Sequence, residues 1–224
     1  MKHVRPNLAV VARRTEPPDS LDYFPTPPWA TRAFVRHVFL PLLGAQPHNH
    51  VMEPACGEGH MAAVLSEAFD TVSASDIFPY GYGAVVDFLA PDGPESDWVV
   101  TNPPFNAGVR FCRTALERTR IGCVMLVRTQ WLHTDDRFFL FQDFPPYLLA
   151  YPVERIPMHK GRWEPKGSTA TDYVWVCWRH GHDPRPPVWI PPGQRKALSR
   201  PDDAVRFGAL QPAPLLEIMK GAQA

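Results

Sequence analysis

The sequence predicts an α/β fold built around a mostly parallel, doubly wound sheet. Short apolar runs of strand length alternate with stretches in which apolar residues recur at helical spacing. Several of these runs end in a glycine turn, an acidic residue or a proline turn, at the edge where such sheets bind their ligands. The chain has 224 residues, 45% of them hydrophobic, which is enough to bury a single core.

The first expected strand, residues 50–55, runs into a turn that contains two glycines. Gly57 and Gly59 lack a Cβ atom and can adopt positive φ, so a ligand can approach the backbone just after Glu53 and Ala55. Apolar residues at helical spacing predict a helix over 61–69. The third glycine of the dinucleotide-binding pattern is absent, which argues against a dinucleotide cofactor.

The next two expected strands, 71–77 and 84–86, each lead to an aspartate. Asp76 follows Glu53 by 23 residues, about the spacing at which an acidic residue accepts hydrogen bonds from ribose hydroxyls. Asp87 follows the shorter run and is followed by Phe88. Either aspartate alone is better explained by a surface loop, but their order after successive strands favours a shared binding site.

The fourth strand runs directly into Asn102-Pro103-Pro104-Phe105. Proline has no backbone N–H, so this turn presents carbonyl oxygens beside the Asn102 side chain, and such acceptors suit an –NH2 group. Phe105 can stack on the ring that carries this group, which contributes roughly 1–3 kcal/mol for a nucleobase. The same four residues also form ordinary turns, so the context has to decide.

An N-terminal segment, residues 22–29, completes the pattern. It contains Thr26 and Pro27 and leads as a stiff, proline-rich stretch into a helical pattern over 33–39. In this order, the N-terminal segment, glycine turn, two aspartates and Asn-Pro-Pro-Phe turn resemble the motifs of γ-class DNA adenine N6-methyltransferases. That family uses S-adenosylmethionine and carries an NPPF or NPPY motif.

The resemblance implies a Rossmann-like class I methyltransferase fold, with a mostly parallel seven-stranded sheet that ends in an antiparallel hairpin. It implies that the target base leaves the helix and gives its amino hydrogens to the Asn102 carboxamide and the Pro103 carbonyl, without a dedicated general base. The implied catalytic residues are Asn102, Pro103, Pro104 and Phe105. The implied cofactor-binding residues are Thr26, Pro27, Glu53, Ala55, Gly57, Gly59, Asp76, Asp87 and Phe88.

Beyond the turn, periodicity predicts helices over 109–116 and 135–141 and strands over 121–127, 147–151, 153–158 and 173–178, the last two forming the hairpin. The hairpin connection, 159–170, is far longer than a hairpin requires. It carries Lys160, Arg162 and Lys166, which we expect to contact phosphates, and Trp163, which we expect to be exposed and to stack.

The charge is segregated along a chain whose net charge is zero. Residues 53–105 carry nine acidic residues and no Lys or Arg, whereas 155–200 carry nine basic residues and three acidic ones. A basic half suits a polyanion such as DNA, with RNA as a further possibility, and a solvated basic surface is the alternative explanation.

We expect residues 1–183 to form one catalytic domain and 184–224 a Pro-rich extension. No run of about 18 apolar residues and no signal sequence is present, which predicts a cytoplasmic protein without a membrane partner. Cys56, Cys112, Cys123 and Cys177 are scattered, which predicts free buried thiols and no metal site. The oligomeric state is not predicted.

The same motifs leave other functions open. The turn also suits an RNA base N-methyltransferase, a DNA cytosine-N4 methyltransferase or a protein-glutamine methyltransferase, and the chain could be an inactive nucleic-acid-binding domain. No separate block of about 80–100 residues is available as a target-recognition domain, which predicts relaxed sequence specificity. Small enzymes of this kind resemble those that phages and prophages carry.

Overall fold

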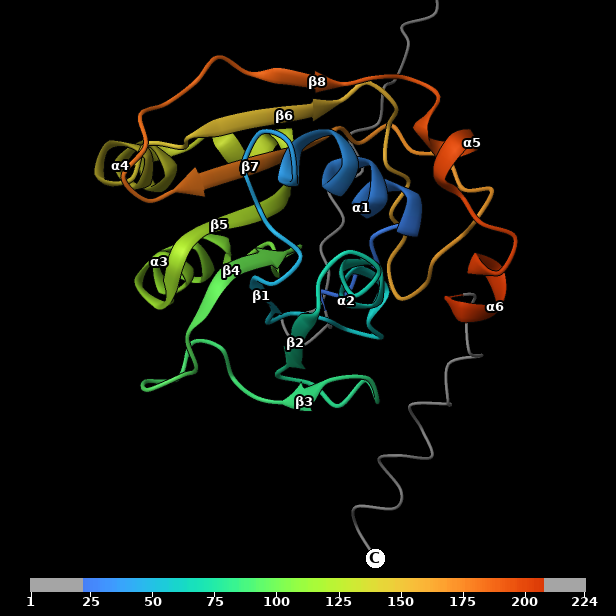
Figure 1. Ribbon diagram of the computed structural model, residues 1–224, viewed down its shortest axis with the longest axis horizontal. Helices are drawn as coiled ribbons and strands as arrows, with labels where there is room; N and C mark the ends of the chain where they lie inside the picture. The colour runs from blue at the N-terminus through green and yellow to red at the C-terminus, as the bar shows by residue number, and fades with distance from the viewer. Residues whose placement is uncertain (1–21, 208–224) are drawn as a thin grey trace, which may run out of the picture.

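The structure, a computed structural model, describes residues 22–207. One sheet runs through the described chain in the order β3-β2-β1-β4-β5-β7-β6-β8 (Figure 1). Its strands are β1 (His50–Glu53), β2 (Thr71–Asp76), β3 (Ala84–Val85), β4 (Ser96–Thr101), β5 (Thr119–Arg128), β6 (Leu148–Pro152), β7 (Tyr173–Arg179) and β8 (Val188–Ile190). The predicted α/β class with a mostly parallel sheet is confirmed.

The sheet is parallel except at β7, which is antiparallel to both β5 and β6. The edge strand β8 pairs in parallel with β6 and makes the described sheet eight-stranded rather than seven-stranded. The prediction of a strand over 153–158 is wrong, because the antiparallel partner of β7 is β6. Ile156 and Met158 belong instead to the apolar cluster around α1 (Pro28–Phe34), and Pro157 has no backbone N–H with which to pair.

Helices cover both faces of the sheet (Figure 1). One face carries α3 (Gly108–Arg118) and α4 (Asp135–Asp143), and the other carries α1, its π-helical continuation η1 (Val35–Phe39) and α2 (His60–Leu65). Strand β5 alternates between these layers: Val124 and Leu126 join the cluster around α1, whereas Cys123 and Met125 join the cluster around α3. A strand buried on both faces explains why its sequence is almost continuously apolar.

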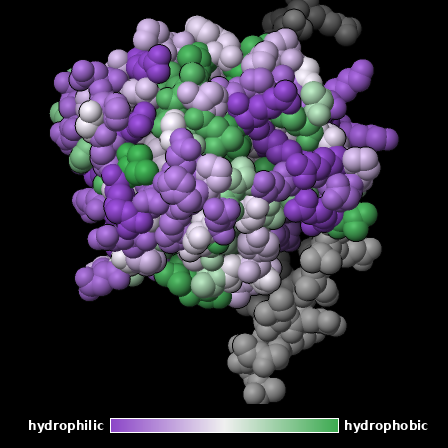
Figure 2. Space-filling model, viewed as in Figure 1, coloured by the Kyte–Doolittle hydropathy of each residue, from purple (hydrophilic) through white to green (hydrophobic). Residues whose placement is uncertain are grey.

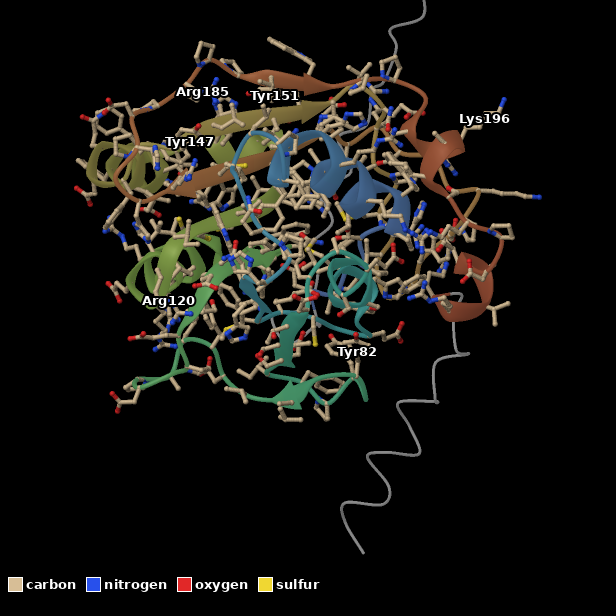
Figure 3. All side chains as sticks on the ribbon, in the orientation of Figure 1. Tyr82, Arg120, Tyr147, Tyr151, Arg185 and Lys196 are labelled. Carbon is tan, nitrogen blue, oxygen red and sulfur yellow. The ribbon has the colours of Figure 1, made fainter. Side chains whose placement is uncertain are left out.

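Residues 184–207, the first part of the expected extension, pack on the domain. They form β8, α5 (Gln194–Leu198) and α6 (Asp203–Arg206). Arg32 of α1 makes two hydrogen bonds of 2.7 Å to the buried Asp203 carboxylate and two of 2.8 Å to Glu67. Arg185 likewise donates to the hydroxyl of Tyr147, and both are labelled in Figure 3. The rest of the extension, 208–224, lies outside the described residues.

Residues 22–207 contain neither a candidate membrane-spanning helix nor a candidate metal-ligand cluster. None of the helices described there is long and apolar enough to cross a membrane, and no group of three or more metal-ligating side chains was found. On the face shown in Figure 2, hydrophobic patches are separated by hydrophilic surface. The four cysteines are free and buried.

Candidate active site

A cavity of about 290 Å³ opens at the carboxyl ends of β1, β2 and β4. This edge is where doubly wound sheets bind ligands. Eight of the predicted site residues line the cavity: Thr26, Glu53, Ala55, Asp76, Asp87, Phe88, Asn102 and Pro104. The other predicted residues of the cofactor and catalytic motifs do not line the cavity but are sequence neighbours of residues that do: Pro27, Gly57, Gly59, Pro103 and Phe105.

The glycine turn has the conformation that the sequence predicts, with φ of +51° at Gly57 and +84° at Gly59. However, aromatic rings pack against both glycines. A Cβ atom on Gly57 would lie 2.2 Å from the ring of Tyr23, and one on Gly59 would lie 2.3 Å from the ring of Tyr82, labelled in Figure 3. Glycine is therefore required at both positions, because a larger side chain would clash with the two tyrosine rings that pack against the turn.

Glu53 brings an unpaired carboxylate oxygen to the cavity. Its side chain is 2% exposed, and its Oε2 atom has no hydrogen-bond partner. Burial, together with the nearby Asp76 carboxylate, raises the pKa of Glu53 well above its usual value. A buried acceptor without a donor is costly, so this position suits a ligand that brings a cationic N–H group.

His60 lies beside Glu53 in the cavity wall and holds the turn closed. Its Nε2 atom is 3.0 Å from the carbonyl oxygen of Phe207, and because a carbonyl only accepts, Nε2 carries the proton. Nδ1 lies 3.2 Å from the hydroxyl of Tyr23, which donates its hydrogen to Glu58 Oε2 at 3.1 Å. Burial lowers the pKa of His60 to about 4, so the ring is neutral at physiological pH. The imidazole therefore links the N-terminal and C-terminal segments across the site.

The two aspartates predicted for the cofactor lie at the carboxyl ends of their strands. Asp76 accepts hydrogen bonds from the backbone N–H groups of Gly57 at 2.9 Å and Phe78 at 3.0 Å, so it also fixes the glycine turn. Asp87 is exposed and accepts from the N–H of Leu89 at 2.9 Å. Phe88 is buried with its ring 5.1 Å from that of Phe111. Both carboxylates and this ring border one cavity.

Asn102 is held in one orientation by the N-terminal segment. Its Nδ2 group donates to the carbonyl oxygen of Phe24 at 2.8 Å and to Thr26 Oγ1 at 3.3 Å. These bonds identify the amide nitrogen, because the Phe24 carbonyl only accepts. The other amide atom, Oδ1, is buried and has no partner. The site thus holds a fixed hydrogen-bond acceptor ready for an N–H donor.

Phe105 is fixed through both its backbone and its ring. Its N–H donates to Asp22 Oδ2 at 2.5 Å. The guanidinium carbon of Arg128, the last residue of β5, lies 3.9 Å from the centre of the Phe105 ring. One face of the ring predicted to stack on the target is therefore covered by an arginine.

Residues 159–170, the loop that carries Lys160, Arg162 and Lys166 (the basic loop), begin beside this site. The sulfur of Met158 lies 3.5 Å from Asn102 Nδ2, and the N–H of Gly161 donates to the carbonyl of Tyr23. Lys166 is exposed and Lys160 half-buried, while Arg162 forms a hydrogen-bonded ion pair with Glu164. These three side chains therefore belong to a loop that is anchored beside the site.

Trp163 does not match its predicted exposure. It is 8% exposed and forms a small apolar cluster with Val64 and Phe207. The expectation of an exposed tryptophan is wrong because the C-terminal segment, far away in the sequence, supplies a ring that covers it. Stacking of Trp163 on a nucleic acid would require this cluster to open.

Several site residues were not predicted. Sequence reasoning selected Thr26 and Pro27 from the N-terminal segment, whereas Asp22, Tyr23 and Phe24 make the contacts to both turns. Their aromatic and acidic character just before the proline run was the available signal. Position alone indicates Arg128, since it ends a parallel strand at the ligand-binding edge.

Comparison with known proteins gives the same fold. No protein-family profile and no curated protein sequence matches the chain. Among solved structures, a proposed RNA methyltransferase from Pyrococcus horikoshii is 15% identical with a TM-score of 0.53, over 74% of this chain and 89% of that one. The fold is that of Rossmann-like methyltransferases.

Two larger proteins share this fold. The M protein of the type I restriction enzyme EcoKI matches 72% of this chain at 12% identity and a TM-score of 0.53. A modification subunit of a proposed type I restriction enzyme from Vibrio vulnificus YJ016 matches 90% at 12% identity and a TM-score of 0.52. The matched regions span 44% and 53% of those chains, so this protein corresponds to about half of each.

Proposed function

We propose that the protein is an S-adenosylmethionine-dependent methyltransferase that modifies the exocyclic amino group of a nucleobase, N6 of adenine in DNA. The observation that carries this proposal is the buried, unpartnered Oδ1 atom of Asn102. Its orientation is fixed by two hydrogen bonds from the same amide, so it can accept from an amine without reorganisation.

The cavity residues fit S-adenosylmethionine, which supplies an electrophilic methyl group when bound. The unpaired Oε2 atom of Glu53 would accept from the ammonium group of the methionine part. Asp76 would accept from ribose hydroxyls, and Asp87 would accept from the adenine amine while Phe88 packs near its ring. Residues 53–105 carry nine acidic residues and no Lys or Arg, and this excess of negative charge suits a cationic sulfonium cofactor.

The chemistry required of the protein is limited. The amine lone pair of a nucleobase is delocalised into the ring, which makes the amine a poor nucleophile. Acceptance of its two hydrogens by Asn102 Oδ1 and the Pro103 carbonyl favours a tetrahedral nitrogen, whose lone pair is free to attack. These interactions strengthen as positive charge develops on the nitrogen, so they act mainly in the transition state. The target base must first leave a duplex, at a cost of a few kcal/mol.

The substrate class is supported by the basic loop anchored beside Asn102 and by the names of two similar structures, which refer to a restriction enzyme and to RNA methylation. Incubation with radiolabelled S-adenosylmethionine and separate DNA, RNA and protein acceptors tests this proposal. We expect label in DNA, recovered as N6-methyl-2′-deoxyadenosine by nucleoside mass spectrometry. Label found only in protein, as methylglutamine, would show that the substrate is a protein and not a nucleic acid.

We expect Glu53→Gln to weaken S-adenosylmethionine binding at least about tenfold, because the cofactor ammonium then loses a charged partner in a buried site. The raised pKa of Glu53 adds a pH dependence: binding to the wild type should tighten as pH rises through that pKa, since the carboxyl must lose its proton to pair with the ammonium. Calorimetry at a series of pH values from acidic to mildly alkaline measures both effects. Glu117→Gln is the control, because Glu117 lies on α3 outside the cavity. Glu67→Gln would not serve, because Glu67 binds Arg32. A wild-type pH profile in Glu53→Gln would contradict the assignment.

We expect simultaneous replacement of Lys160, Arg162 and Lys166 by Ala to flatten the salt dependence of DNA binding. Each phosphate contact that is lost should reduce the log–log slope by roughly one unit, and cofactor binding should be unaffected. Pairing with Glu164 should reduce the contribution of Arg162. Fluorescence anisotropy at increasing salt measures the slope. The matched control replaces three basic residues elsewhere, Arg110, Arg113 and Arg120, by Ala. An equal change of the salt slope in both variants would mean that the loop has no specific role.

A further inference from the structure

The rings of Phe24 and Phe105 form an open angle beside the catalytic turn. Their centres are 5.1 Å apart and their planes are inclined by 41°. The guanidinium carbon of Arg128 lies 3.9 Å from the centre of the Phe105 ring and 5.3 Å from that of Phe24. The first distance is that of a stacked pair, so the guanidinium covers this face of Phe105.

This angle borders the proposed methyl-transfer site. Phe24 lines the cavity, and its carbonyl oxygen accepts the hydrogen bond that orients Asn102. Phe105 follows Asn102 by three residues in a turn stiffened by two prolines. A planar group stacked on Phe105 would therefore lie close to the unpartnered Asn102 Oδ1 atom.

The guanidinium of Arg128 resembles such a group chemically. It is planar and delocalised and carries –NH2 groups, as adenine does at N6. Its Nε atom is buried and has no hydrogen-bond partner, although the guanidinium also hydrogen-bonds the side chain of Tyr173. An arginine fixed for a purely structural role would be expected to have this donor satisfied.

We propose that the angle between Phe24 and Phe105 is the target-binding site for the extruded base, and that Arg128 occupies it in the free protein and moves away when the base enters. This inference rests on the proposed function. Phe24 then forms the second wall of the target site. Arg128 competes with the base for the face of Phe105, so each binding event must displace it.

Displacement of the side chain requires no change in the fold. Arg128 is the last residue of β5, where the backbone pairs with Tyr173 of β7, and the chain then leaves the sheet as η2 (Thr129–Leu132). Only the side chain, which is half-buried, has to move.

The test compares the full-length wild type with Arg128→Ala in steady-state methylation of mixed-sequence single-stranded DNA. We expect the KM for DNA to fall by about three- to tenfold, since a cation–π contact no longer has to be broken. With S-adenosylhomocysteine present, binding of an oligonucleotide that contains 2-aminopurine should show stronger quenching in Arg128→Ala. The log–log salt slope of binding should be unchanged, because the occupying side chain releases no counterions.

Arg113→Ala is the matched control. Arg113 also lies over an aromatic ring, 5.5 Å from the centre of Phe144, but on α3 and paired with Asp143. Its loss removes the same charge, so a KM that falls equally in both variants would overturn the proposal. Arg128→Met keeps most of the side-chain volume, so it shows whether an altered KM in Arg128→Ala results from lost packing. Thermal unfolding of each variant measures directly whether the fold is weakened.

Other outcomes also decide the matter. An unchanged KM in Arg128→Ala, a higher KM with a salt slope reduced by about one unit, or a lower kcat with unchanged KM would each overturn the inference. The second result would make Arg128 a phosphate contact, and the third a positioning residue for the reaction. Failure of the wild type to methylate any nucleic acid would instead refute the proposed function, and the two failures are thus distinguishable.

Discussion

Replacement of Asn102 by alanine should reduce methyl transfer by at least about 10²–10³-fold, the usual cost of removing one preorganised transition-state partner. The expected effect is large because Oδ1 is a fixed acceptor at the site, and the Pro103 carbonyl alone cannot hold both amine hydrogens. Single-turnover kinetics with saturating cofactor and DNA measure the loss. Cofactor affinity, measured by calorimetry, should change little, since the cofactor residues lie on other strands.

A graded control separates the two ends of the Asn102 amide. Thr26→Val removes one acceptor of Nδ2 but leaves the Phe24 carbonyl, so we expect a smaller loss, about five- to twentyfold, from a less rigid Oδ1. Asn106→Ala removes an exposed amide from the same turn and should cost less than about threefold. Equal loss of cofactor binding and rate in Asn102→Ala would mean that Asn102 supports the structure rather than the chemistry.

The central sheet could be predicted because its signals are local. Strands β1, β4 and β5 are mostly apolar and β2 alternates, and β1, β2 and β4 end in or just before a polar residue predicted for the site. Chain order and the resemblance to methyltransferase motifs together predict the place of Asp76 and Asn102, because parallel strands bring their carboxyl ends to one edge of the sheet. The cavity gathers eight of the predicted residues for this reason.

The errors have a common physical cause in contacts between distant segments. Val153 to Met158 alternates like a strand, but the chain leaves the sheet there and its apolar residues pack on α1. Trp163 stands in a polar loop, yet Phe207 covers it. Burial by a partner more than 40 residues away leaves no periodic signal near the residue concerned. The same applies to Arg128, whose position over Phe105 depends on two separate strands.

The C-terminal segment is tied to the domain by a buried charge network, and its disruption should have the largest effect on stability. Arg32 is 7% exposed and binds both carboxylate oxygens of Asp203 and of Glu67. Arg200 and Arg206 also pair with Glu67. We expect Arg32→Met to lower the free energy of unfolding by about 3–5 kcal/mol at pH 7, because two carboxylates lose their buried partner. Urea unfolding measures this change.

The network also predicts how stability depends on pH. Burial raises the pKa values of Glu67 and Asp203, but the hydrogen bonds and charge of Arg32 outweigh it, and both values are lowered. A carboxyl group whose pKa is lower in the folded state stabilises the protein above its unfolded pKa of about 4, and this contribution is lost as pH falls through the folded value. The wild type should therefore lose stability below about pH 4, and Arg32→Met should lose less over the same window.

An exposed ion pair provides the control for both measurements. In the pair of Arg113 and Asp143, the side chains are 40% and 54% exposed, so Arg113→Met should change the free energy of unfolding by no more than about 1 kcal/mol. Because α6 brings Phe207 to His60 and Trp163, Arg32→Met should also loosen the basic loop, seen as faster hydrogen exchange over 159–170. A small stability loss in Arg32→Met, equal to that of the control, would show that the C-terminal segment is held by its apolar contacts instead.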